Sequence, residues 1–432
     1  MARRVDSHTL KGMLLRSNTR LLLTSVMLLQ FTALLLLSFK RDPIDAQALV
    51  MSLLLPGLTW GVVNLYGKLW QVDRALLILV MLLCSVGLIT LQDIARAAIT
   101  PLNQALFVLM GMVAMAAGIV LMRRLRRWDR WQPFLMAGAA LFLLSPLVIG
   151  EWNNGAKNWI KLPFVNQSIQ PSEFVKPLLI VVLAGGLAGR PRFWKCLPAL
   201  AFAGGLCALL LLERDLGALL IYFLTTVAVY YAATSNALVT LFGLGIGAGG
   251  ALIAYHAFPY VQKRIEMFIN PWSDPRDSGW QIIQALISIG SGWLFGMGLG
   301  LGYPRNIPLY HSDFIFAALS EEFGLIFALM LLVVYLLIVL RGMSVALNAR
   351  TSFHALTALG VVVLLGVQAF INVGGNIKMI PLTGVTLPFI SAGGSSMVSM
   401  CLSFGLLLGV SSINAHDEAD DLTRMTWREA GG

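Results

Sequence analysis

Long apolar runs, separated by polar connections, occupy most of the chain. About twelve of them can be distinguished, near residues 20–39, 48–66, 75–92, 105–122, 133–150, 174–189, 196–212, 216–233, 237–257, 314–340, 354–374 and 395–413. Each is close to the roughly 20 residues that a helix needs to cross a bilayer, and none alternates like a barrel strand. The pattern predicts an all-α integral membrane protein, a polytopic bundle of about twelve transmembrane helices.

Composition and charge argue against a soluble protein and against several kinds of site. Only 12% of the residues are charged and 58% are hydrophobic, whereas a soluble domain carries about 25% charged residues. The net charge of +10 is concentrated in short connections such as 123–127, as expected for cytoplasmic loops, so we do not expect a nucleic-acid partner. The cysteines are far apart and fit neither a metal site nor a disulfide framework: Cys84, Cys196, Cys207 and Cys401.

The positive-inside bias predicts which connections face outward. Alternating the runs from a cytoplasmic N-terminus places both termini inside and puts three polar, Gly- and Pro-rich connections outside, namely 151–173, 258–312 and 375–394. Long loops in compact chains are usually functional, so we expect a site that opens to the outside. The acidic tail 414–432 is expected to be cytoplasmic and disordered.

Asp313 is the most informative ionisable residue. It lies where an outer loop enters an apolar helix, with its carboxylate near the membrane surface. That placement suits a general base, or a metal ligand, acting on a lipid-linked substrate. A simple N-cap of the helix is the structural alternative.

Two further charged groups border apolar runs. Glu173 and Lys176 are three residues apart, so on a helix they share one face and can pair, either at a site or merely neutralising each other. The triplet 213–215 predicts a tight outer turn, for which a structural ion-pair turn is the alternative. The segment 381–396 is rich in Pro and Gly, and such broken backbone is tolerated at membrane depth only where it lines a cavity or packs against protein.

Taken together, five strings resemble the SEDS family (shape, elongation, division and sporulation), whose members include RodA, FtsW and SpoVE. They are GAKNW at 155–159, QPSEFVK at 170–176, ERDLG at 213–217, HSDFIFAALSEEFG at 311–324 and PLTGVTLPFISAGGSS at 381–396. The family core has ten helices, which implies that the runs 20–39 and 48–66 are an added pair. The resemblance therefore divides the chain into 1–70 with the added pair, a membrane catalytic domain 71–413, and the tail 414–432.

The resemblance implies a peptidoglycan glycosyltransferase in the bacterial cytoplasmic membrane. Such enzymes polymerise lipid II, an undecaprenyl-pyrophosphate-linked disaccharide peptide, at the outer face with a class B penicillin-binding protein, in elongation, division or sporulation. Asp313 matches the catalytic aspartate, acting as base or holding a divalent cation (Mg or Mn), and no organic cofactor is expected. Because the reaction inverts the anomeric centre, one carboxylate base suffices.

By the same resemblance, several residues become candidates for substrate binding. The cations would balance the charge of the pyrophosphate, although which of them touches it stays open, since Asn158 stands where many members have Arg. The candidates are Lys157, Trp159, Glu173, Lys176, Asp215, Arg264, His311, Lys378 and Ser395.

Two rival functions fit parts of the pattern. A lipid II flippase would also need polar groups in the membrane. The candidates cluster on the outer face, however, and the runs 75–92 and 105–122 carry almost no ionisable residues. A scaffold that only recruits the penicillin-binding protein is a third possibility, against which the presence of Asp313 argues.

Overall fold

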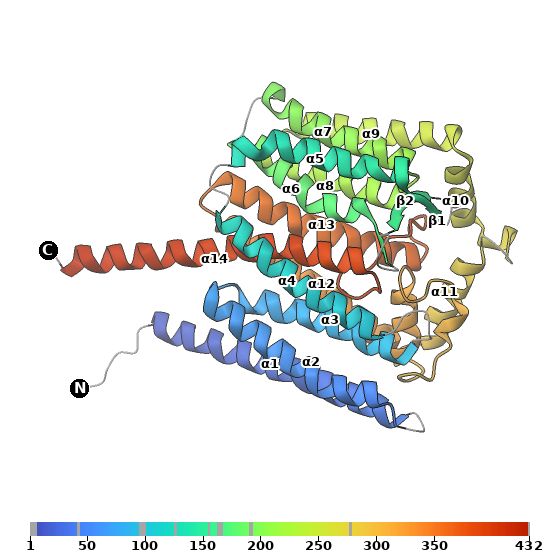
Figure 1. The fold of residues 1–432 in the computed structure, drawn as a ribbon, viewed down its shortest axis with the longest axis horizontal. Coiled ribbons are helices and arrows are strands. Elements are labelled where there is room, and N and C mark those ends of the chain that lie inside the picture. Colours follow the sequence, from blue (N-terminus) through green and yellow to red (C-terminus); the bar gives the residue numbers. More distant parts are fainter. Residues whose placement is uncertain are drawn as a thin grey trace.

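The computed structural model describes residues 7–40, 44–94, 101–124, 128–153, 156–161, 167–189, 193–275 and 279–430 of the chain. The described residues form α-helices, two short 3-10 turns and a small sheet (Figure 1). The helices are α1 (Ser7–Lys40), α2 (Ala46–Leu69), α3 (Arg74–Ile94), α4 (Pro101–Arg124), α5 (Trp128–Ile149), α6 (Pro171–Leu187), α7 (Phe193–Leu212), α8 (Leu216–Thr234), α9 (Ala237–Ala257), α10 (Pro259–Ile269), α11 (Trp280–Gly292), α12 (Ile315–Leu347), α13 (Ser352–Asn376) and α14 (Gly394–Ala430). The strands are β1 (Glu151–Asn153), β2 (Ala156–Lys161) and β3 (Ser168–Ile169), and the 3-10 turns are η1 (Pro271–Ser273) and η2 (Pro304–Asn306).

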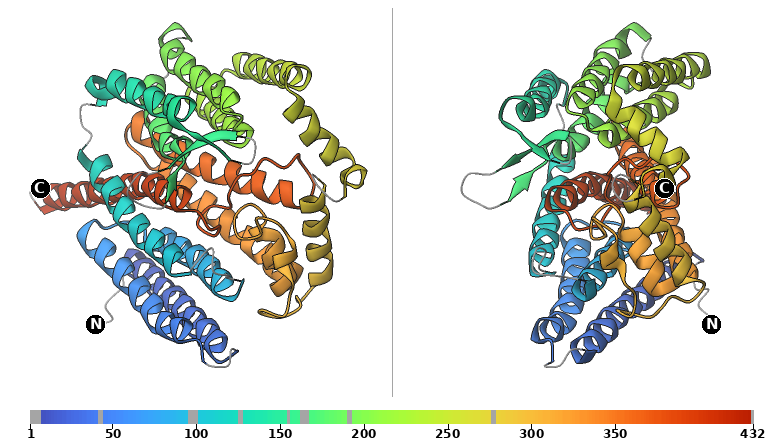
Figure 2. Two further views of the ribbon diagram at one scale, coloured as in Figure 1. Left: turned by 45° about the vertical axis from the view of Figure 1, so that its right-hand side comes forward. Right: turned by 90° about the vertical axis from the view of Figure 1, so that its right-hand side faces the viewer.

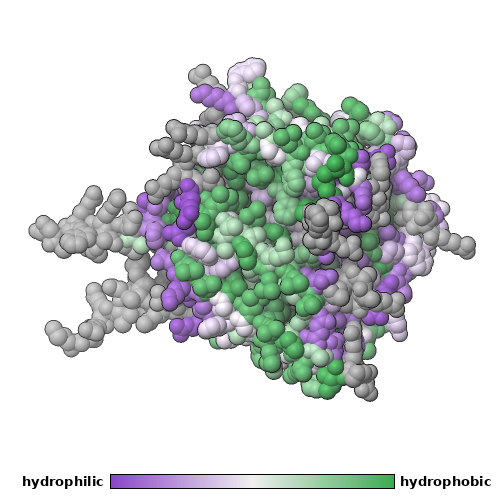
Figure 3. Space-filling model, in the orientation of Figure 1, coloured by the Kyte–Doolittle hydropathy of each residue, from purple (hydrophilic) through white to green (hydrophobic). Residues whose placement is uncertain are grey.

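The predicted membrane fold is confirmed. Among the described residues, 11 helices are long and apolar enough to cross a bilayer. The remaining apolar run is α6, whose 17 residues reach the lower limit of a span. Figure 3 shows apolar side chains around the middle of the bundle and polar ones toward its two ends. The helices α10 and α11, inside the long connection 258–312, were not predicted from the sequence.

The two termini and the polar connections lie at opposite ends of the bundle. In Figure 1 both termini lie at the left, whereas β1, β2, α10 and α11 lie at the right. This arrangement matches the alternation expected from the apolar runs. Figure 2 shows that the hairpin of α1 and α2 lies along one edge of the bundle.

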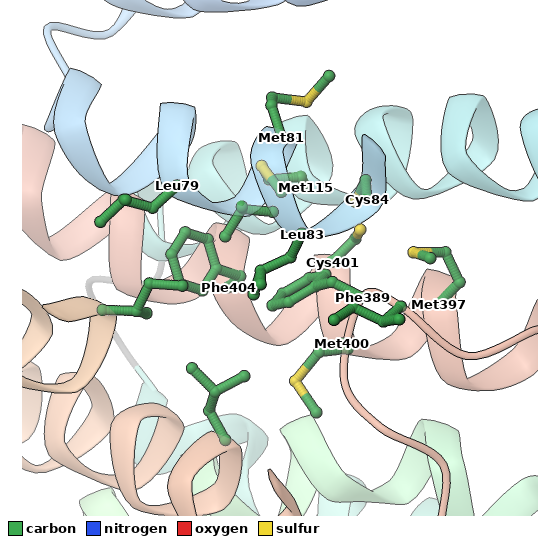
Figure 4. Close-up of a cluster of buried hydrophobic side chains, with 14 of the residues drawn as sticks. Leu79, Met81, Leu83, Cys84, Met115, Phe389, Met397, Met400, Cys401 and Phe404 are labelled. Carbon is green, nitrogen blue, oxygen red and sulfur yellow. The ribbon is translucent and has the colours of Figure 1, made fainter. Parts of the chain in front are cut away.

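The broken segment between α13 and α14 is anchored in the bundle core. Phe389, from this segment, contacts Phe404 of α14 edge to face, with ring centroids 5.7 Å apart. Figure 4 shows both rings among buried side chains of α3, α4 and α14, including Cys84, Met115 and Cys401. The segment therefore packs against protein rather than lipid, which is the condition for irregular backbone at this depth.

Helix α12 is interrupted at Gly324. This residue has φ 81° and ψ 176°, a conformation that side chains other than glycine's rarely allow. The connection 293–298 joins the helix at the interruption through four backbone hydrogen bonds, from Leu325 N to Trp293 O (2.9 Å), Ile326 N to Leu294 O (3.2 Å), Met297 N to Glu321 O (2.9 Å) and Gly298 N to Glu322 O (3.0 Å). The backbone groups freed by the break are thus paired again.

Polar contacts join the first two helices to the rest of the bundle. Gln30 Nε2 of α1 donates to Ser85 Oγ of α3 at 2.6 Å, and both residues are buried. At the end of α1, Lys40 Nζ lies 2.9 Å from Asp93 Oδ1 and 2.7 Å from Gly300 O. The hairpin of α1 and α2 therefore contacts the end of the bundle that carries the long polar connections, as well as the edge along which it lies.

The C-terminal tail differs from the expectation of disorder, because α14 continues as a helix to Ala430. The expectation rested on the acidic composition of the tail alone. A helix that is already nucleated in the membrane adds further turns at little cost, and residues such as Ala, Glu, Leu and Arg favour it. Asp417 Oδ2, in this extension, lies 3.5 Å from Arg350 Nε in the connection between α12 and α13.

Candidate active site

Asp313 lies in the turn that precedes α12, with its side chain half-buried. The N-cap of α12 is Phe314, with no side-chain cap bond, so the Asp313 carboxylate does not have the capping role considered as an alternative. The backbone oxygen of Asp313 accepts hydrogen bonds from Asn372 Nδ2 and Asn376 Nδ2 of α13, both at 2.9 Å. These bonds hold the backbone of Asp313 in place without using its carboxylate, which can therefore act on a substrate.

The broken segment 377–393 faces this turn and is bonded to it. A Cβ placed on Gly384 would lie 3.5 Å from Asp313 Oδ2. Ala392 N donates to His311 O at 2.8 Å, and Ser391 Oγ donates to Ser312 O at 2.6 Å. The strings at 311–324 and 381–396, which are far apart in sequence, therefore form one unit around the carboxylate.

Helix α10 brings a cation to the same place. Arg264 Nη1 donates to Leu382 O of the broken segment at 3.2 Å. Burial lowers the pKa of Arg264, while the negative charges of Asp215 and Asp313 oppose that shift. Lys378 Nζ reaches Ile269 O, at the end of α10, at 3.3 Å. Arg264 and Lys378 thus link α10 to the broken segment beside Asp313.

The pKa of Asp313 suits a general base. Burial raises it to about 6, although a hydrogen bond from Ser312 and the charge of Arg264 act in the opposite direction, and Asp215 adds slightly to the rise. A carboxylate with this pKa is ionised at neutral pH yet is a stronger base than an ordinary aspartate. Burial lowers the pKa of the neighbouring His311, which favours its neutral form.

Asp215 organises the polar connection 156–172. Its Oδ2 accepts hydrogen bonds from Asn158 Nδ2 (2.9 Å), Gln170 Nε2 (2.9 Å) and Ser172 Oγ (3.2 Å), and its Oδ1 accepts one from Ala218 N, which caps α8. The carboxylate is buried and has most of its acceptor positions occupied. Its geometry therefore fits ordering of this connection better than direct contact with substrate.

The candidates of the first outer connection lie on the small antiparallel sheet β1-β2-β3 and beside it. Trp159 is half-buried on β2. Lys157 Nζ donates to Leu147 O in the last turn of α5 at 2.8 Å, where the helix dipole favours a cation. Ser395 Oγ of α14 accepts from Gln170 N at 3.2 Å, which joins this connection to the broken segment's end.

Glu213, beside Asp215, is the most unusual carboxyl group at this end of the bundle. It is fully buried, and neither of its side-chain oxygens has a hydrogen-bond partner among the described residues. Burial, and to a smaller degree the charge of Asp215, raises its pKa to about 8. The group therefore holds its proton at neutral pH.

We expect Glu213→Gln to gain stability over the wild type as the pH rises. A raised folded-state pKa means that the folded protein binds the proton more tightly, so the wild type loses stability between about pH 4.5 and 8. Gln carries no titrating proton and should escape that loss. Thermal unfolding of both proteins in detergent across this range measures the difference, with the exposed Glu266→Gln as control. A difference that does not change with pH would show that Glu213 is ionised in the folded protein.

The pair of Glu173 and Lys176 predicted from their spacing is present on α6. Lys176 Nζ lies 2.7 Å and 2.8 Å from the two oxygens of Glu173, and 2.9 Å from Gln368 Oε1 of α13. Both residues of the pair are buried. These contacts use the three donors of the ammonium group, which favours the self-neutralising interpretation of the pair over contact with pyrophosphate.

Three amide residues of α13 are part of the site and were missed from the sequence. Gln368 holds Lys176 and also donates to Thr386 O at 3.1 Å, while Asn372 joins Asp313 O to Val385 O at 2.7 Å. Asn376, the third of them, also donates to Asp313 O. They are spaced four residues apart inside an otherwise apolar run, so they share one helical face. That spacing is the signal that could have revealed them.

No group of three or more His, Cys, Asp or Glu side chains that could hold a metal occurs within the described ranges. Asp313 on its own is a plausible ligand only for a cation such as Mg²⁺, which is often held by one or two carboxylates together with water and substrate phosphates.

Comparison with known proteins assigns most of the chain to one family. A family model described as cell cycle protein, FTSW_RODA_SPOVE, matches residues 69–416. Peptidoglycan glycosyltransferase RodA of Mycobacterium tuberculosis is 35% identical over 329 residues, covering 72% of this chain and 70% of that protein. Stage V sporulation protein E of Bacillus subtilis is 33% identical over 357 residues, covering 78% of this chain and 96% of that protein.

Solved structures share the fold. A chain from a peptidoglycan synthase complex, described as coordinating polymerization and crosslinking, aligns with a TM-score of 0.66 at 29% identity, covering 79% of this chain and 98% of that chain. The crystal structure of the rod shape determining protein RodA of Thermus thermophilus aligns with a TM-score of 0.59 at 28% identity, covering 80% of this chain and 98% of that one.

Proposed function

Because this chain belongs to the FtsW, RodA and SpoVE family of cell cycle proteins, we propose that it is a peptidoglycan glycosyltransferase that polymerises lipid II into glycan strands. The observation that supports this most directly is the placement of Asp313, whose carboxylate faces the broken segment with Arg264 nearby. The test is glycan-strand formation from labelled lipid II by the purified protein, with and without a cognate penicillin-binding protein. Absence of strands under both conditions would contradict the proposal.

In the proposed mechanism, Asp313 takes the proton from a sugar hydroxyl of one lipid-linked disaccharide. The hydroxyl oxygen attacks the anomeric carbon of a second molecule, and the bond from that carbon to the pyrophosphate oxygen breaks. The leaving pyrophosphate keeps the bonding electrons, and a nearby cation stabilises the charge that develops on it. Arg264 is the candidate with the best placement, because it neighbours Asp313, whereas the donors of Lys176 are already occupied.

Binding of a divalent cation such as Mg²⁺ or Mn²⁺ is the alternative role proposed for Asp313. Asp313 would be its protein ligand, with the substrate pyrophosphate and water supplying the remaining oxygens. When bound, it would neutralise charge on the pyrophosphate. The proton transfer assigned to Asp313 does not depend on it.

The alternative of lipid II translocation receives less support. A transport path needs polar groups with free hydrogen-bonding capacity across the membrane. The buried polar network formed by Glu173, Lys176 and Gln368 is closed by its own hydrogen bonds.

We further propose that both termini are cytoplasmic and that the site is extracytoplasmic, with a class B penicillin-binding protein as partner. The basic connections near the termini support the orientation. The partner is supported by the similar chain of the peptidoglycan synthase complex.

This orientation predicts the outcome of a labelling experiment. A cysteine introduced at Trp272, which is exposed on η1 at the site end, should react with an impermeant thiol reagent in intact spheroplasts. A cysteine at Lys68, exposed at the opposite end, should react only after the cells are permeabilised. The parent protein would have its own cysteines replaced by serine. Labelling of the Lys68 position in intact spheroplasts would reverse the topology.

A further inference from the structure

A cavity of about 740 Å³ lies between the N-terminal hairpin and the bundle. Its polar lining comes from Thr19 and Arg20 of α1, Asn64 of α2, Gln71 of the following connection and Arg74, the first residue of α3. The end of α2 and the beginning of α3 both lie there, so the cavity is at the end of the bundle opposite Lys40 and Asp93. It is therefore remote from the candidate active site.

The two arginines of the cavity have no carboxylate partner among the described residues. Neither Arg20 nor Arg74 forms an ion pair in the part of the chain that the structure describes. The acidic residue next to Arg74 is Asp73, and its carboxylate is bound to Arg341 Nε at 2.6 Å and caps α3. Two guanidinium groups thus share one cavity, and no carboxylate among the described side chains pairs with either.

The position of Arg74 depends on a glycine. A Cβ on Gly67 of α2 would lie 2.5 Å from Arg74 Nε, so the guanidinium crosses α2 where that helix has no side chain. Gly67 therefore makes room for the cation at the wall of the cavity. A larger residue at position 67 would make the Arg74 guanidinium shift from this place.

The remaining lining of the cavity is apolar. Leu23 of α1, Val63 of α2, Val72 of the connection after α2 and Ile78 of α3 supply it. A ligand that satisfies both parts needs an anionic group for the guanidinium pair and an apolar portion beside it. Arginine pairs bind phosphate with bidentate hydrogen bonds, and basic pockets between membrane helices suit phosphate headgroups.

We propose that this cavity binds the phosphate headgroup of an anionic phospholipid from the leaflet at the N-terminal end of the bundle. The hairpin contributes Arg20 and Asn64, whereas Gln71 and Arg74 belong to the region matched by the family model. The bound lipid would thus connect the hairpin to the family core and stabilise the folded protein as any ligand of the native state does. The inference does not depend on the enzymatic activity.

The test uses the full-length protein in nanodiscs of phosphatidylcholine, with or without phosphatidylglycerol. Phosphatidylglycerol should raise the thermal unfolding midpoint of the wild type, and native mass spectrometry should detect the retained lipid. The double variant Arg20→Gln and Arg74→Gln should lose this rise. In detergent titrations its apparent affinity for phosphatidylglycerol should fall by at least about tenfold, since hydrogen bonds to charged groups contribute that much.

The control is the double variant Lys68→Gln and Arg124→Gln, which removes the same charge from exposed residues at the same end of the bundle. It should respond to phosphatidylglycerol like the wild type, and an equal loss would reduce the effect to general surface charge. An equal rise with inorganic phosphate would indicate a free-anion site instead of a lipid site. Either result would overturn the proposal.

A second variant, Gly67→Ala, covers the case in which the double arginine variant does not fold. It keeps both charges and favours the helix, but its methyl group displaces Arg74. Weakened binding of phosphatidylglycerol by folded Gly67→Ala supports the site, and wild-type binding would overturn it.

Discussion

Asp313→Asn should fold normally and lose glycan-strand formation by about 10²- to 10⁴-fold, the usual contribution of a general base. Asn keeps the size of the side chain but cannot take up a proton. The fold should be preserved because the side chain of Asp313 does not cap α12, and its hydrogen bonds with Asn372 and Asn376 use the backbone oxygen. Polymerisation of labelled lipid II measures the loss, and thermal unfolding checks the fold.

Two further expected results make this prediction specific to the Asp313 carboxylate. Asp274→Asn, the same substitution elsewhere in the long connection, should retain activity. In the wild type, activity should rise with pH through about 6, because the base must be ionised and burial raises the pKa of Asp313 to that value. A stable Asp313→Asn protein that still polymerises at nearly the wild-type rate would rule out the proposed mechanism. Loss of translocation in vesicles without any polymerase would support the flippase instead.

Lys176→Met should destabilise the protein by about 3–5 kcal/mol, the usual cost of removing one partner of a buried ion pair. The variant leaves Glu173 without its cation and Gln368 without its donor, in a region where both members of the pair are buried. A lower unfolding midpoint in detergent is the expected result. An unchanged midpoint would mean that water or another group solvates Glu173.

The double variant Lys176→Met and Glu173→Gln separates the two interpretations of this pair. It removes both charges, so much of the stability should return, as in other proteins in which a buried ion pair was replaced. If the pair only orders α6 and α13, polymerisation should return with it. If Lys176 contacts pyrophosphate, the protein should be stable but inactive.

The fold was predictable from the sequence because the bilayer imposes a strong rule on composition. Each expected apolar run lies in one helix of the structure, and the irregular segment after Lys378 is irregular as expected. The amphipathic α10 was missed because 11 residues in a polar connection do not form a membrane-length apolar run. The helical tail beyond residue 413 was missed because charge alone does not distinguish a disordered tail from the continuation of a helix.

The site was predictable only in part. Asp313 stood out because a carboxylate at the start of an apolar helix is costly, and Glu173 and Lys176 stood out by spacing. Charge could not reveal Gln368 or Asn372, whose neutral amides hold the site together. Nor could sequence show that one oxygen of Asp215 accepts three side-chain donors, because these come from separate places in the chain.

The interruption of α12 at Gly324 has a mechanical consequence. Asp313 lies in the turn just before the short portion that ends at the break, and this portion is bonded to the connection 293–298 after α11. The long portion that spans the bilayer is bonded to the same connection through Leu325 N and Ile326 N. Because one connection thus holds the helix on both sides of the break, the direction of the bilayer-spanning portion and the position of the turn that carries Asp313 are coupled mechanically through residues 293–298.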